Sequence, residues 1–232
     1  MLRECTLEEI SDGRTYGLND MVKADTGNCQ GCHKCCTGMG SSIVLDPYDI
    51  WLMKNHLSMS FQELLNAGRI ELNMVDGLIL PNLKMGVDNK CTFLDSEGRC
   101  SIHSSRPGIC RIFPLGRVYD ETGFKYFLQK NECIKENRAK IKVKKWIDTA
   151  NIDENQNFIL EWHIFIRDIG NRVIALRDSG KGERINDIAM FVLNDFYVSD
   201  IVGMDKDNSS KVYDRFINMI KISRDSIDKI SG

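Results

Sequence analysis

The feature that most constrains this chain is the motif Cys29-x-x-Cys32-x-x-Cys35-Cys36, which is followed at a distance by four more cysteines. Eight of the nine cysteines therefore lie between residues 29 and 133. Thiols at this density either bind metal or form disulfides, and the cellular compartment decides between the two. The four later cysteines that we take as metal ligands are Cys91, Cys100, Cys110 and Cys133.

The rest of the sequence favours a reducing compartment. The first ten residues are too acidic and too interrupted for the apolar core of a secretory signal. No run approaches the roughly 18–20 apolar residues that a membrane-spanning helix needs. We therefore expect a cytoplasmic protein with reduced thiols and no membrane partner. Cys5 lies outside the cysteine-rich stretch, and we interpret it as a spare thiol.

Composition and charge are those of an ordinary globular protein, with 42% apolar residues, 28% charged residues and a formal net charge of -2. This balance predicts no nucleic-acid partner. We expect an unspecified protein or peptide partner. A basic run is interrupted by acidic neighbours, and we interpret it as a solvated face. It comprises Lys135, Arg138, Lys140, Lys142, Lys144 and Lys145.

Local signals predict an α+β fold, with short hairpins and helices in the cysteine-rich part and a helical C-terminal part. Asp46-Pro47 predicts a helix to about residue 56, because Asp caps a helix and Pro suits its first position. Asp76-Gly77 predicts a hairpin turn. We expect a weakly ordered lead-in at 1–28, a metal-binding domain at 29–150 and a helical part at 151–232. Further expected elements are a capped helix from Ser60 to about Gly68, hairpins around 95–98 and 120–123, and helices at 144–148, 154–177, 186–198 and 212–230.

The cysteine spacing fits more than one metal. Zinc takes four Cys or His ligands, commonly in closely spaced pairs. A [4Fe-4S] cluster takes four thiolates, and Cys-x2-Cys-x2-Cys is a ferredoxin spacing. Eight thiolates suffice for two clusters, for two zinc ions, or for one cluster with cysteines left over. Because Cys36 directly follows Cys35, we expect its side chain to point elsewhere, toward a second metal or a second face of one cluster. His33 and His103 are expected to hydrogen-bond beside the ligands rather than to ligate.

The order of these motifs resembles the YkgJ-type cysteine-cluster proteins, which are also described as zinc- or iron-chelating CxxCxxCC domain proteins. The resemblance covers roughly residues 29–150, and flagellin lysine N-methylases are a related group. It rests on the four-cysteine motif, Cys91-x-Phe-Leu, Gly98-x-Cys100-x-Ile-His103, Arg106-Pro107-x-x-Cys110-Arg111-x-Phe-Pro114 and Cys133. It implies metal binding by the eight cysteines. We expect Arg106 and Arg111 to assist the cofactor by donating to sulfur or by offsetting thiolate charge.

Three functions stay open at this point. The first is a metal-binding protein, with iron–sulfur favoured over zinc, that acts in redox chemistry or in protein or peptide modification. The second is a zinc-stabilised structural or interaction module. The third is an enzyme that resembles the lysine methylases, although the helical part after residue 150 contains no motif that we assign to a methylase.

Overall fold

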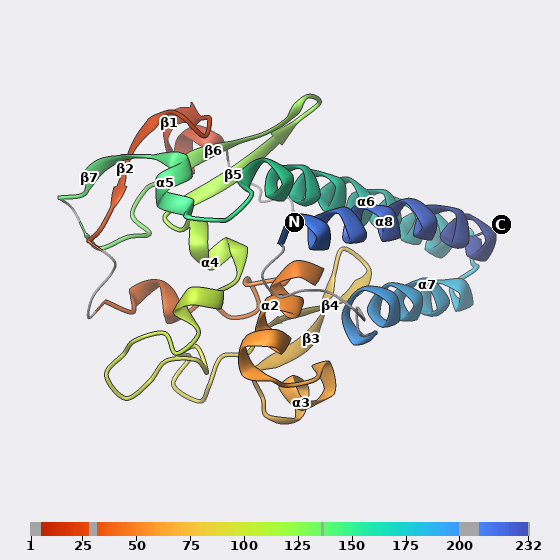
Figure 1. Cartoon of the computed structure of the whole chain (residues 1–232). Coiled ribbons are helices and arrows are strands. Elements are labelled where there is room, and N and C mark those ends of the chain that lie inside the picture. Colours follow the sequence, from red (N-terminus) through yellow and green to blue (C-terminus); the bar gives the residue numbers. More distant parts are fainter. Residues whose placement is uncertain (1–5, 28–31, 136, 200–208, 232) are drawn as a thin grey trace. The chain divides into compact units, whose positions relative to one another are not determined.

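The computed structural model describes residues 6–27, 32–135, 137–199 and 209–231, and the chain divides into two compact units (Figure 1). The first unit comprises Met1–Ile43 and Leu83–Thr149, and the second comprises Val44–Asn82 and Ala150–Gly232. Residues 44–82 thus pack with the C-terminal helices, although they lie within the cysteine-rich part of the sequence. The expected domain boundaries at residues 28 and 150 stay a prediction, because compactness alone does not show that a unit folds independently.

The predicted α+β class is confirmed by short antiparallel strand pairs and a helical C-terminal part. The first unit contains α1 (Leu7–Ile10), β1 (Ser11–Tyr16), β2 (Met21–Asp25), η1 (Lys34–Cys36), η2 (His103–Ser105), α4 (Gly108–Ile112), β5 (Leu115–Asp120), β6 (Gly123–Gln129), β7 (Ala139–Lys142) and α5 (Val143–Ile147). The second contains α2 (Pro47–Leu57), α3 (Phe61–Asn66), β3 (Ile70–Val75), β4 (Leu78–Leu83), α6 (Ile152–Asp178), α7 (Glu183–Leu193), the π-helix η3 (Asn194–Val198) and α8 (Ser209–Ser231).

A three-stranded sheet of order β1-β6-β5 forms one part of the first unit. β5 and β6 are a hairpin whose register runs from Leu115↔Leu128 to Asp120↔Gly123, so the predicted turn at residues 120–123 is confirmed. The hairpin buries Leu115 and Tyr126, each 1% exposed. β6 buries three successive residues, Tyr126, Phe127 and Leu128, so both faces of this part of the strand are covered and the sheet is anchored to the core of the unit.

The first unit also contains a two-stranded sheet, in which β2 pairs with β7. Val22 and Ala24 are buried beneath it, whereas Met21 and Lys23 point outward. Strands β1 and β2 differ from the weak order that we expected for residues 1–28. Their partner strands, β6 and β7, lie far along the chain, so the pairing cannot be predicted from local signals in this stretch.

The second unit begins with two capped helices, as predicted. At α2, the Asp46 carboxylate accepts a hydrogen bond from the Asp49 backbone N–H at 2.8 Å. At α3, the Ser60 hydroxyl accepts from the Glu63 N–H at 3.2 Å, and the Ser60 N–H donates to the Glu63 carboxylate at 2.7 Å. These bonds satisfy N–H groups that have no partner within the helix.

The β3–β4 hairpin closes through Asp76 and Gly77, which have φ values of 49° and 83°. Two left-handed residues in succession form the tight turn predicted from this pair. A Cβ on Gly77 would lie 2.6 Å from Cγ1 of Val173, a buried residue of α6. Glycine is therefore required here both for the backbone conformation and for the close approach of the helix.

The C-terminal helices pack through aromatic side chains, and Figure 1 shows α6 and α8 side by side. The rings of Trp162 and Phe196 are 5.0 Å apart, and those of Phe158 and Phe216 are 5.6 Å apart. The predicted helix at 186–198 is α7 followed by the π-helix η3. Among the helices of the described residues, none combines the length and the apolarity that crossing a bilayer requires.

Candidate metal centre

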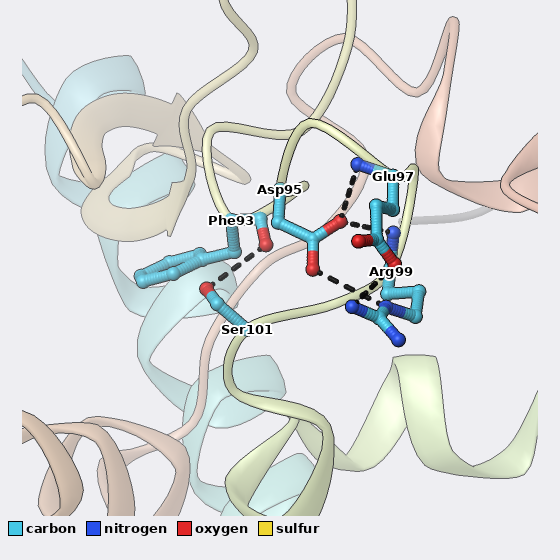
Figure 2. Close-up of polar contacts among 5 residues, drawn as sticks. All are labelled: Phe93, Asp95, Glu97, Arg99 and Ser101. Atoms are coloured by element: carbon cyan, nitrogen blue, oxygen red, sulfur yellow. Dashed lines mark hydrogen bonds and ion pairs between the residues drawn. The ribbon is translucent and has the colours of Figure 1, made fainter.

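Cys91 and Cys100 lie on the two arms of a tight loop, whose polar contacts are shown in Figure 2. The Asp95 carboxylate accepts hydrogen bonds from the backbone N–H groups of Glu97 and Arg99, at 2.9 Å and 2.8 Å. Because its carboxylate accepts these bonds, the pKa of Asp95 is lowered, with the Arg99 N–H as the largest cause. The sequence Asp95-Ser-Glu-Gly98 therefore closes the predicted turn through its own aspartate.

A buried side chain anchors this loop to the unit. Phe93 is 2% exposed, and its carbonyl accepts hydrogen bonds from the N–H and the hydroxyl of Ser101 at 2.8 Å and 2.9 Å (Figure 2). Cys91 precedes this anchor by two residues and Cys100 directly precedes Ser101. Both thiols thus belong to a loop that Phe93 fixes to the core of the unit.

The four-cysteine motif meets this loop through backbone hydrogen bonds. The Cys91 N–H donates to the Cys36 carbonyl at 2.8 Å, and the Gly38 N–H donates to the Asn89 carbonyl at 2.8 Å. A Cβ on Gly98 would lie 2.8 Å from Nδ1 of His33, so the imidazole rests against the Gly98 backbone. The four-cysteine motif and the loop that bears Cys91 and Cys100 are far apart in the sequence. These contacts, which lie next to their cysteines, hold the two segments together.

Cys110 lies on the short helix α4, which α5 holds in place. The Trp146 indole Nε1 donates to the carbonyls of Ile112 and Phe113, at 3.1 Å each. Ile112 is 3% exposed and packs in the core. The side chain of Trp146 thus fixes the end of the helix that presents the Cys110 thiol.

The thiols of Cys35 and Cys36 hydrogen-bond to each other. Chiefly because of this bond, the pKa of Cys35 falls to about 7 and the pKa of Cys36 is raised. Burial and the nearby thiols of Cys35, Cys110 and Cys91 raise the pKa of Cys36 further. The two thiols thus lie closer together than we expected from their adjacency, and the expected role of Cys36 toward a second metal or a second face of one cluster stays a prediction. The 3₁₀ turn η1 brings the two sulfur atoms together despite their adjacency in the sequence.

Cys100 belongs to the same group of thiols. Its pKa is raised, mainly by burial, with smaller contributions from Cys91 and Cys35. Five thiols from three segments are thus close enough for the charge of one to affect the ionisation of another. A site of this kind favours a cation, because each thiolate makes the next harder to form without one. We call this group the five-thiol cluster: Cys35, Cys36, Cys91, Cys100 and Cys110.

The cluster gathers soft donors but is not an assembled coordination shell. The seven cysteines in the described part of the chain are free thiols, and each is half-buried. Among the described residues, no three Cys, His, Asp or Glu side chains are arranged to hold a metal ion. Cys32 and Cys133 are described as free thiols, and their part in the site stays a prediction. Cys29, like Cys5, lies outside the described residues, so the predicted eight-cysteine ligand set stays a prediction.

Arg106 is the cation beside the cluster. Its positive charge favours the ionised form of both Cys35 and Cys100, although burial keeps the pKa of Cys100 raised on balance. Its Nε is buried and has no hydrogen-bond partner among the residues that the structure describes. Its Nη1 contacts Nε2 of His103. A buried donor without an acceptor next to thiolates fits an additional acceptor such as a sulfur atom, so the residues present fit a thiolate-bound metal group.

Arg111 and the histidines have other surroundings. Arg111 donates to the carbonyls of Ser104 and Asp148 at 2.7 Å and 3.2 Å, which ties the η2 loop to the end of α5; its expected contact with a cofactor stays a prediction. The pKa of His103 is lowered, first by burial and then by Arg106 and Arg111. His33 is exposed and lies against Gly98.

Two residues that position the site were not predicted from the sequence. Trp146 was assigned only to a short helix, and Gly98 only to a turn. A signal was present for Gly98, since a glycine at the end of an Asp-initiated loop often has positive φ, and here φ is 73°. This signal does not indicate which distant side chain Gly98 contacts, and the sequence around Trp146 does not indicate its hydrogen-bond partners.

Comparison with known proteins agrees with the cysteine pattern. The CxxCxxCC family model, described as "Putative zinc- or iron-chelating domain", matches residues 28–149, a little over half of the chain. No curated protein and no solved structure matches the chain, so the link to flagellin lysine N-methylases stays a prediction. The matched region contains the five-thiol cluster and Arg106, and this chain therefore belongs to the CxxCxxCC family of zinc- or iron-chelating domains.

Proposed function

We propose that this chain holds an iron–sulfur cluster and acts in redox chemistry or in protein or peptide modification in the cytoplasm. The observation that carries the proposal is the convergence of the five-thiol cluster from three separate segments. All the donors of the cluster are sulfur, which suits iron–sulfur clusters and soft metals. The proposed ligands are Cys29, Cys32, Cys35, Cys36, Cys91, Cys100, Cys110 and Cys133.

The chain's own residues would hold such a group from several sides. The Cys91–Cys36 backbone hydrogen bond keeps the two thiol-bearing segments together. Arg106 would donate its buried Nε–H to sulfur and offset part of the negative charge of the thiolates. When bound, an iron–sulfur cluster supplies one-electron transfer, with a potential set by nearby charge and by hydrogen bonds to sulfur.

Metal analysis separates iron–sulfur from zinc. The whole chain is purified without oxygen and analysed for iron, acid-labile sulfide and zinc, and its visible spectrum is recorded. Iron and sulfide in similar amounts with a brown colour are the expected result. Zinc alone in a colourless protein would replace the redox proposal with a zinc-stabilised module. Less than one bound metal ion of either kind per chain would refute a metal site altogether.

Cysteine variants test the site itself. Serine replaces sulfur with oxygen at almost unchanged size, so Cys36→Ser and Cys91→Ser remove a soft ligand with little change in packing. We expect both variants to lose most of the bound metal. Cys5→Ser is the control, since Cys5 lies outside the family match, and it should keep the wild-type metal content. A full metal complement in Cys36→Ser would show that Cys36 is not a ligand.

A further inference from the structure

The sheet formed by β2 and β7 presents an exposed basic face. Neighbouring positions along a strand point to opposite sides, and here Val22 and Ala24 point inward. The opposite side carries one apolar residue that is 49% exposed, together with three exposed lysines. We call this the basic face, and it consists of Met21, Lys23, Lys140 and Lys142.

The lysines of this face are not paired with carboxylates in the part of the chain that the structure describes. Among the described residues, no ion pair involves Lys23, Lys140 or Lys142. The register pairs Met21 with Lys142 and Val22 with Ile141, which places all three lysines on one short strand pair. Like charges on neighbouring strands repel each other. A partner that brings carboxylates would relieve this repulsion.

The acidic groups at the ends of the face limit its length. The Asp20 carboxylate accepts from the Gly17 N–H at 2.7 Å, and the Asp25 carboxylate accepts from the Gly27 N–H at 2.9 Å. One carboxylate thus lies at each end of β2. A continuous phosphate backbone that crossed the face would meet these charges, whereas a compact patch of carboxylates would not.

A hollow adjoins the face at the end where Asp25 pairs with Ala139. Its volume is about 610 Å³, and exposed Ile134 and Lys135 are among the residues that line it. It can receive an apolar side chain of a bound partner, in line with the apolar Met21 on the face itself. Charge and an apolar contact thus occur together, as in the interfaces of transient protein complexes.

We propose that the basic face docks an acidic protein partner, whose carboxylates pair with Lys23, Lys140 and Lys142. The two strands of the face flank the cysteine-rich stretch in the sequence: β2 ends four residues before Cys29, and β7 begins six residues after Cys133. The proposal depends on the exposed charges alone and holds for either metal. Its failure would leave the metal-binding proposal untouched.

The test uses the whole metal-loaded protein and two labelled probes of equal negative charge, an oligoglutamate peptide and a single-stranded oligonucleotide. The combined variant Lys23→Glu/Lys140→Glu/Lys142→Glu reverses the face. Lys181→Glu/Lys221→Glu/Lys229→Glu is the control, because it changes the net charge equally at exposed positions of the other unit. Each exposed ion pair changes a binding constant by roughly 1.5- to 5-fold, so three together change it by about tenfold.

We expect saturable, salt-sensitive binding of the peptide that weakens about tenfold in the face variant and less than about twofold in the control. Equal weakening in both variants would show that net charge alone governs binding and would overturn the proposal. Tighter binding of the oligonucleotide, lost in the face variant, would overturn it in favour of nucleic acid. If the reversed variant does not fold, the three lysines are changed to glutamine, and a weakening of several-fold is then expected.

Discussion

The contact between Gly98 and His33 joins the four-cysteine motif to the loop that bears Cys91 and Cys100, and Gly98→Ala tests it. Gly98 has a φ of 73°, where an alanine costs about 1–2 kcal/mol. The new Cβ would also lie 2.8 Å from Nδ1 of His33. Moving the imidazole costs about 1 kcal/mol more, because the ring is exposed but rests on this backbone. The total loss of stability is then about 2–3 kcal/mol.

Gly13 provides the matched control. Its φ is 75°, and a Cβ there would meet no atom within 4 Å. Gly13→Ala therefore measures the backbone cost alone, about 1–2 kcal/mol. For a chain of this size, the extra loss in Gly98→Ala corresponds to a melting temperature about 2–4 °C lower than in Gly13→Ala.

The assay is thermal unfolding of the metal-loaded protein followed by circular dichroism, repeated in a His33→Ala background. Removing the imidazole should cancel the extra cost of Gly98→Ala and leave the effect of Gly13→Ala unchanged. Equal losses for the two glycine variants in both backgrounds would refute the idea that His33 holds the loop against the motif.

Three further changes test other parts of the first unit. Trp146→Phe removes the donor to two carbonyls at the end of α4 and should cost about 1–2 kcal/mol in a denaturant titration, with metal content reduced as well. Gly116→Ala places a Cβ 2.7 Å from Cε1 of Phe127 and should cost about 1–3 kcal/mol; an unchanged midpoint would show that the sheet accommodates the methyl group. The pKa of Asp95 is lowered on folding, so its stabilisation is present above the unfolded carboxyl pKa of about 4 and is lost as the pH falls through the folded value. Asp95→Asn should therefore melt below wild type at neutral pH and converge with it in acid.

Local signals predicted those parts of the fold that depend on neighbours in the chain. The capping residues Asp46 and Ser60 were correct, and so was the Asp76-Gly77 turn. Each of these works through hydrogen bonds or dihedral angles within a few residues. The partners of β1 and β2 could not be predicted, because the sequence of a strand of five or six residues does not specify the distant strand with which it pairs.

The same division applies to the site. Cysteine spacing predicted a thiol-rich centre, and the family match supports it. The contact between the thiols of Cys35 and Cys36 was missed, because it depends on the 3₁₀ turn between His33 and Thr37. The role of Trp146 was also missed, since an indole in a short helix is an ordinary core residue until its hydrogen-bond partners are known.

The pairing of β2 with β7 has a consequence for synthesis on the ribosome. β2 leaves the ribosome before the four-cysteine motif, and its partner β7 follows only after Cys133. At ~5–20 residues per second, on the order of ten seconds pass between synthesis of the motif and synthesis of β7. During that interval the thiols of the motif lack the strand pairing of the completed unit, so we expect stable metal binding only after β7 has left the ribosome.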